Sequence, residues 1–150
     1  MTVKDFLKNT ALKRNMLETA KYISEKCDYD YYSNLTFDCK RKMKEIQSDW
    51  KKVGSAGNQE KILRNQFKTV QDIFWKKIKL VNMEMRILEL SDESSELHDD
   101  WEIALSQHKN EKADRLYEAY ERKEDKIADL SYEQARIEEE LQILQGEYSE

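Results

Sequence analysis

The complete absence of proline is the feature that most constrains the fold of this chain. None of its 150 residues is proline and only three are glycine. Because these two residues interrupt helices most strongly, long helices can run here without a break, whereas a β-sandwich or barrel would need many more turns. Charged residues make up 38% of the chain and apolar residues 39%, a balance typical of helices with one narrow buried stripe and a wide solvated face. We therefore expect an all-α protein.

Cysteine usage and hydropathy indicate the compartment. Cys27 and Cys39 are too few for a disulfide framework, and no Cys/His cluster has the spacing of a zinc site. The amino-terminal residues lack the apolar run of a signal peptide, and no stretch approaches the length of a membrane span. We expect a cytoplasmic protein with no membrane partner.

The two parts of the chain carry opposite charge. Residues 1–90 contain 19 Lys+Arg and 12 Asp+Glu, and residues 91–150 contain 7 and 19. Such asymmetry is typical of a region that faces nucleic acid, of an acidic tail, or of two segments that attract each other. Solvated helix faces explain it equally well.

Apolar spacing predicts a first helix from about Leu12 to Cys27, after an amino-terminal extension of residues 1–11. The apolar stripe of this helix consists of Leu12, Met16, Ala20, Ile23 and Cys27. The Asp28–Asn34 segment is rich in turn formers, and Ser33 or Asn34 is suited to cap a second helix. This second helix has a stripe of Cys39, Met43, Ile46, Trp50 and Val53. Gly54 should end it in the left-handed conformation, and the short loop to residue 58 predicts antiparallel packing.

A third helix follows, with a stripe of Leu63, Phe67, Val70, Phe74, Ile78, Val81, Met85 and Leu88. The spacing thus predicts a three-helix antiparallel module over residues 12–90. Ser91–Ser95 contains capping serines and early acidic residues, so we expect a fourth helix to start there.

Residues 91–150 are expected to form an acidic helical segment with a long coiled-coil helix. From Ala113 to Tyr148, apolar residues follow a heptad pattern for about five repeats, interrupted by Lys123 and Gln134. The residues before His108 are out of phase with this register, which indicates a stutter or break near His108–Glu111 and a fold-back onto the third helix. The expected coiled-coil interface consists of Leu116, Tyr120, Ile127, Leu130, Ile137, Leu141 and Leu144.

The second and third helices resemble a bacterial family called domain of unknown function 349. The family's Leu-x-x-Leu-Gln-x-x-Trp-Lys-x-Ile-Gly-Pro run is similar to Met43, Ile46, Gln47, Trp50, Lys51, Val53 and Gly54, and its later aromatic positions are similar to Phe67, Phe74 and Trp75. The proline of the family is Ser55 here, and a tryptophan is Arg64. The resemblance covers residues 12–79 and implies a cytoplasmic three-helix module without catalytic residues.

No pattern of catalytic or cofactor-binding residues is present, and we expect a protein that is not an enzyme and has no cofactor. His98 and His108 do not converge on one helix face, and phosphate loops and nucleophile elbows are absent. His98, Asp99, Asp100 and Glu102 are better explained as an acidic helix surface than as a metal site. Tyr29, Tyr31 and Tyr32 fit a contact surface or the end of a bundle equally well.

Two functions remain open. The first is an interaction or adaptor protein, because an uncovered seam would strand several Leu and Ile side chains in water. Either a second copy covers the seam, giving a homodimer, or a protein partner does, or the acidic helix folds back in cis. The alternative is an RNA- or ribosome-associated protein whose basic face is modulated by the acidic segment. The candidate nucleic-acid contacts are Lys40, Arg41, Lys44, Lys51, Lys52, Lys68, Lys76 and Lys77.

Overall fold

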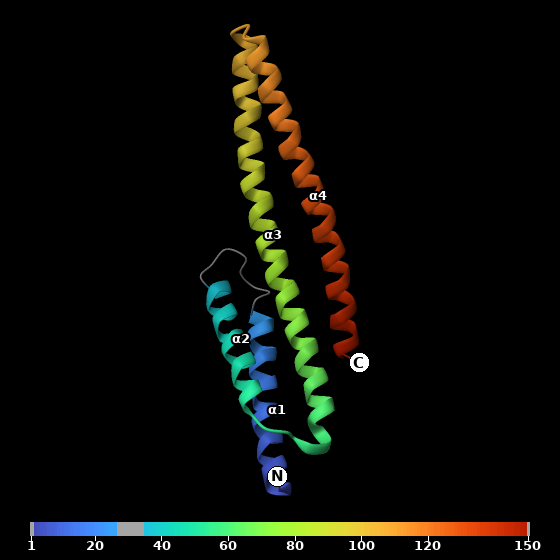
Figure 1. Ribbon diagram of the computed structural model, residues 1–150. Coiled ribbons are helices and arrows are strands. Elements are labelled where there is room, and N and C mark those ends of the chain that lie inside the picture. Colours follow the sequence, from blue (N-terminus) through green and yellow to red (C-terminus); the bar gives the residue numbers. More distant parts are fainter. Residues whose placement is uncertain (1, 27–34, 150) are drawn as a thin grey trace. The chain divides into compact units, whose positions relative to one another are not determined.

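The structure, a computed structural model, describes residues 2–26 and 35–149. This part of the chain contains no strand. Its elements are the α-helices α1 (Val3–Lys26), α2 (Leu35–Lys52), α3 (Glu60–Ser106) and α4 (Asn110–Ser149), with a short 3-10 helix η1 (Gly57–Gln59) before α3 (Figure 1). The all-α class is thereby confirmed for the described residues. None of their helices is both long enough and apolar enough to span a membrane.

The chain divides into two compact units. The first comprises Met1–Lys79 with Glu140–Glu150, and the second, which we call the hairpin, comprises Leu80–Glu139. Both α3 and α4 therefore contribute residues to both units. The predicted boundaries at residues 11 and 90 do not coincide with these divisions.

The core of the first unit is built by α1, α2 and the first part of α3. Leu17, Ala20 and Ile23 of α1 pack in one buried cluster with residues of α2 and α3. In the same cluster the rings of Trp50 and Phe67 stack, with centroids 4.0 Å apart and planes 5° from parallel. The apolar stripe predicted for the second helix is thus the buried face of α2. Its members Cys39, Met43 and Trp50 are buried, and Ile46 packs against them.

The first helix begins at Val3, nine residues before the predicted start at Leu12. A reciprocal cap explains this start, because the Thr2 backbone N–H donates to the Asp5 carboxylate at 3.0 Å and the Asp5 N–H donates to Thr2 Oγ1 at 3.3 Å. The hydrogen bond from the Thr2 backbone, and after it the one that the Thr2 hydroxyl donates, lower the pKa of Asp5. The predicted stripe was also wrong at Leu12, which is 41% exposed. The predicted stripe member Cys27 and the predicted cap residues Ser33 and Asn34 lie outside the described residues.

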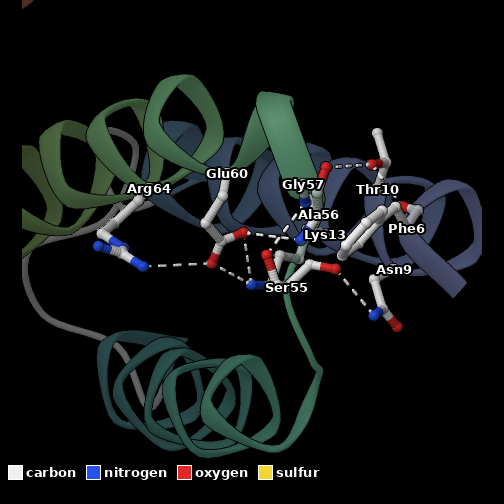
Figure 2. Close-up of polar contacts among 9 residues, drawn as sticks. All are labelled: Phe6, Asn9, Thr10, Lys13, Ser55, Ala56, Gly57, Glu60 and Arg64. Atoms are coloured by element: carbon white, nitrogen blue, oxygen red, sulfur yellow. Dashed lines mark hydrogen bonds and ion pairs between the residues drawn. The ribbon is translucent and has the colours of Figure 1, made fainter. Parts of the chain in front are cut away.

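The α2–α3 connection is held by polar contacts to α1 (Figure 2). Lys13, only 2% exposed, directs its Nζ to both carboxylate oxygens of Glu60 at 2.5 and 2.8 Å. The Ala56 backbone N–H also donates to Glu60, at 3.2 Å. Burial raises the pKa of Glu60, but the hydrogen bonds from Lys13 and Ala56 and the Lys13 charge outweigh burial, so the net shift is downward. These contacts fix the start of α3 against α1.

Gly57, and not Gly54 as predicted, has the left-handed backbone conformation in this connection, with φ of 66°. The predicted end of α2 at Gly54 was also two residues late. The Val53 N–H donates to the Trp50 carbonyl at 3.2 Å, so the last turn tightens without a left-handed residue. The positive φ favours glycine at position 57, and a Cβ atom there would also lie only 3.1 Å from the Phe6 ring.

In the hairpin, α3 and α4 run antiparallel and are joined by a tight turn (Figure 1). His108 has φ of 57°, its N–H donates to the Leu105 carbonyl at 3.1 Å, and the Lys109 N–H donates to the Ala104 carbonyl at 2.9 Å. This pair of bonds is a Schellman motif, which ends α3. The predicted break near His108 is therefore confirmed.

The predicted helix start at Ser91–Ser95 was wrong, because α3 continues through these residues to Ser106. Ser94 is only 2% exposed, and its hydroxyl donates to the Glu124 carboxylate of α4 at 2.5 Å. A serine inside a helix is tolerated when its side chain has a partner of this kind. The predicted stripe of the third helix also fails at its end, since Met85 and Leu88 are 44% and 40% exposed.

Candidate interaction surfaces

The predicted seam residues of α4 are all buried or half-buried. In the hairpin, Ile137 is buried and Leu116, Tyr120, Ile127 and Leu130 are half-buried. Ala113, at the start of the register, is 1% exposed. In the first unit, Leu141 and Leu144 are half-buried as well. The side chain of Tyr148 lies outside the described part of the chain.

The matching stripe on α3 was missed by our reading of the sequence. Its residues recur at alternating spacings of three and four, the heptad spacing expected of two helices packed along a seam. All are buried or half-buried: Leu80, Met83, Ile87, Leu90, Ser94, Leu97, Trp101 and Ala104. The spacing is present in the sequence, but the serines near residue 94 indicated a helix start at Ser91–Ser95 and so divided the stripe. Within the hairpin, α3 and α4 thus each have a stripe of buried or half-buried residues.

Polar contacts cross the hairpin at the two positions that interrupt the α4 register. Lys123 Nζ lies 2.7 Å from a carboxylate oxygen of Glu93, and Gln134 Nε2 donates to Glu84 at 2.8 Å. The hydrogen bond from Lys123 and the Lys123 charge lower the pKa of Glu93. Because each contact pairs one residue of α3 with one of α4, a slip in register would break both.

Four aromatic rings gather near the turn of the hairpin. His98 and Trp101 of α3 meet Tyr117 and Tyr120 of α4, with centroid distances of 5.3 Å for His98–Trp101 and for His98–Tyr120. Trp101 and Tyr117 are 5.2 Å apart, and Tyr117 and Tyr120 are 5.9 Å apart. We call these four residues the aromatic cluster. Tyr117 remains 40% exposed and the adjacent Leu105 43% exposed, so the cluster is partly an outer surface.

An open hollow of 440 Å³ lies beside the aromatic cluster. We call it the end pocket. Its lining residues are Trp101, Leu105, Asp114, Tyr117 and Glu118. Two carboxylates thus line the pocket beside two aromatic rings, and none of the described residues that line it is basic.

The histidines and the acidic residues beside them do not form a convincing catalytic or metal centre. His98 is half-buried in the aromatic cluster, whereas His108 is exposed in the turn. Ligand atoms of His98, Asp99 and Glu102 lie within 4.8 Å of one another, and His98 Nδ1 is 3.5 Å from Glu102. Asp99 and Glu102 are exposed, so solvated side chains explain the arrangement without an ion.

Five of the six basic residues of α2 share one side of that helix, where Lys40 is half-buried and the other four are exposed. At 3.6 residues per turn, Lys40, Lys44 and Lys51 fall within an arc of roughly 40°, and Arg41 and Lys52 extend it to roughly 120°. Arg41 and Lys52 approach Asp38 and Asp49 at 3.6 and 3.8 Å. No ion pair engages Lys40, Lys44 or Lys51 within residues 2–26 and 35–149.

Lys68 of α3 extends this basic surface. Gln47, between Lys44 and Lys51 on α2, donates to the Gln71 side chain of α3. Lys68 is exposed one turn before Gln71, so it borders the same side. We call the resulting surface the basic face, which comprises Lys40, Arg41, Lys44, Lys51, Lys52 and Lys68.

Two predicted nucleic-acid contacts lie elsewhere. Lys77 is 7% exposed and donates to the Ser24 carbonyl at 3.1 Å, in the interior of the first unit. Lys76 pairs with Glu140 near the end of α4 at 2.9 Å. Lys76 and Glu140 line an open hollow of 620 Å³ together with Asp72, Trp75, Lys79, Ile143, Leu144 and Glu147. Charges of both signs meet there, so this hollow is not a simple anion site.

Comparisons with known proteins give no family for this chain. No family model matches it, and the searches of curated proteins and of solved structures found no match either.

Proposed function

We propose that the chain is a non-enzymatic interaction protein, with the closed end of the hairpin as its contact surface for a protein partner. The observation that supports this proposal is the exposure of apolar and aromatic side chains at the closed end of the hairpin. These side chains stay exposed even though α3 covers the seam of α4 in the same chain. Tyr117 and Leu105 are 40% and 43% exposed beside Trp101. Aromatic side chains of this kind contribute strongly to binding at protein interfaces.

The seam itself is, in this proposal, an antiparallel coiled coil closed in cis. The heptad spacing on both helices and the contacts Lys123–Glu93 and Gln134–Glu84 support this assignment. Light scattering should therefore give the monomer mass for the wild-type chain and for Leu130→Asp, while circular dichroism should show lost helicity in the variant. A wild-type dimer that dissociates on this substitution would contradict closure in cis and favour an intermolecular seam.

A photo-cross-linking amino acid at position 105 tests the contact surface. In cells of the native host, position 105 should yield a discrete cross-linked product that mass spectrometry assigns to a second protein. The same amino acid at position 132, where Tyr132 is 78% exposed in the hairpin, is the matched control and should yield none. No product at position 105, or equal products at both positions, would refute this surface.

A second candidate function is RNA contact through the basic face. It uses a different surface and a different kind of partner from the first proposal. The gathering of Lys40, Lys44 and Lys51 on one side of α2, without ion pairs to other described residues, favours it. Binding of this kind depends on counterion release and weakens steeply with salt. The likeness of residues 12–79 to domain of unknown function 349 remains an expectation that bears on neither function.

The basic face is tested on the full chain by titrating RNA at several salt concentrations. Replacing Lys44 and Lys51 with glutamine should reduce affinity and flatten the dependence of log affinity on log salt by about two phosphate contacts. Lys109→Gln with Lys112→Gln, at the hairpin turn, is the matched control and should leave both unchanged. Salt-independent or undetectable binding by the wild-type chain would exclude this function.

A further inference from the structure

The end pocket contains two kinds of side chain that recognise cations. The Trp101 ring of α3 and the Tyr117 ring of α4 both line the hollow, with centroids 5.2 Å apart and planes 43° from parallel. Asp114 and Glu118 are one helical turn apart on α4, on the same side of it. Within the described part of the chain neither carboxylate forms an ion pair.

A site that combines aromatic rings with carboxylates favours a guanidinium group over an ammonium group. A cation over an aromatic face is stabilised by the ring quadrupole, and a carboxylate beside it adds a charge-assisted hydrogen bond. A guanidinium group uses both, because it is flat, stacks on rings, and presents paired donors to carboxylates. The ammonium group of lysine is more strongly hydrated and has no flat face. Leu105 adds an apolar wall for the methylene stem of an arginine side chain.

We propose that the end pocket binds an arginine side chain of a protein partner. The charge of the hairpin is complementary to such a partner, since residues 80–139 contain 18 Asp+Glu and 8 Lys+Arg. This proposal rests on the proposed function, for which it supplies the chemistry of the contact. The arginine stacks on Trp101 or Tyr117 and pairs with Asp114 or Glu118.

The experiment uses the full chain labelled with ¹⁵N and a capped Gly-Arg-Gly peptide as the probe. The chain has three tryptophans, and Trp101→Phe assigns the Trp101 indole signal. This signal should shift and saturate with the arginine peptide, while the signal of the buried Trp50 stays in place. The matched peptide with citrulline, which keeps the shape of arginine and lacks its charge, should produce no saturating shift.

Isosteric variants test the carboxylates. Asp114→Asn with Glu118→Gln should weaken peptide binding about tenfold, equal to about 1.4 kcal/mol. Both residues are exposed, so circular dichroism should show an unchanged fold. Asp129→Asn with Glu138→Gln, also exposed on α4, is the matched control and should bind as the wild type does.

The outcomes separate this proposal from the function on which it rests. Equal shifts with the arginine and citrulline peptides, or unchanged affinity in the Asp114/Glu118 variant, would overturn the arginine pocket even when the cross-link at position 105 persists. The absence of a cross-linked product at position 105 would overturn the proposed function even when the arginine peptide binds.

Discussion

The two units of this protein are stabilised in different ways. In the first unit, large side chains such as Phe74 and Met43 are fully buried among three helices, and a charged side chain, Lys13, is drawn inside with its partner Glu60. In the hairpin, α3 and α4 each have one stripe, and most of the predicted α4 seam residues are half-buried. The charged Lys123 lies within that stripe and pairs with Glu93. The stability of the first unit therefore depends on a well-packed core. The stability of the hairpin depends on the length and register of the contact between its two helices.

The largest expected effect tests the first half of this comparison. Phe74→Ala removes a side chain with 0% exposure from the core of the first unit. The lost burial and the cavity left behind should destabilise that unit by about 4 kcal/mol. Hydrogen exchange followed by mass spectrometry should show faster exchange in α1, in α2 and in the first part of α3. A loss below about 1 kcal/mol would mean that the unit is not held by its core.

The buried ion pair is expected to come next. Glu60→Gln leaves the ammonium group of Lys13 buried without its counter-charge, and should cost about 3 kcal/mol at pH 7. The matched control is Glu18→Gln, which removes an exposed pair with Lys21 and should cost less than about 0.5 kcal/mol. Urea unfolding measures both. If the two variants lose equal free energy of unfolding, the Lys13–Glu60 pair stabilises the fold no more than an exposed pair does.

The same pair has a pH dependence of known sign. The pKa of Glu60 in the folded chain lies below its ordinary value of 4.5. The ionised carboxylate therefore stabilises the fold above about pH 4.5, and this contribution is lost as the pH falls through the folded-state pKa. The stability difference between wild type and Glu60→Gln should shrink when urea unfolding is repeated near pH 3. A difference that stays constant would show that the charge of Glu60 is not its source.

A smaller effect is expected for the seam. Leu130→Ala removes a half-buried side chain of the hairpin and should cost about 2 kcal/mol, since only part of its surface is withdrawn from water. Hydrogen exchange should increase in residues 80–139, where the seam lies, and much less in α1 and α2. An effect as large as that of Phe74→Ala would remove the distinction between core and seam.

Spacing in the sequence predicted the parts of the fold that depend on local periodicity. The stripe of α2 and the break near His108 follow from residues within a few turns of each other. Burial of Lys13 does not, because its partner Glu60 is 47 residues away. Ser94 was misread for the same reason: its partner Glu124 lies on another helix, and without that helix a serine indicates a cap. The pattern of one helix alone therefore gives the wrong environment for buried polar residues, because their partners lie on other helices.

The candidate surfaces show the same limit. The basic residues of α2 were found from composition, but neighbours in sequence point about 100° apart on a helix, and Lys77 turned inward while Lys76 paired with Glu140. The end pocket was not predicted, because its residues come from two helices whose register was unknown. The out-of-phase position of Trp101 relative to the α4 register was the available signal, because Trp101 belongs to the separate stripe of α3.

The smallest expected effect concerns the turn that closes the hairpin, and it is a gain in stability. His108 holds a left-handed conformation, with φ of 57°, which costs a residue with a Cβ atom about 1 kcal/mol and costs glycine little. His108→Gly should therefore stabilise the hairpin by up to about 1 kcal/mol, slowing hydrogen exchange near residues 97–120 and leaving α1 and α2 unchanged. His108→Val, which is strained at positive φ, is the opposing control and should destabilise the same segment. If glycine gives no gain and valine no loss, the turn is not a Schellman motif, and the register of the hairpin is set by its seam alone.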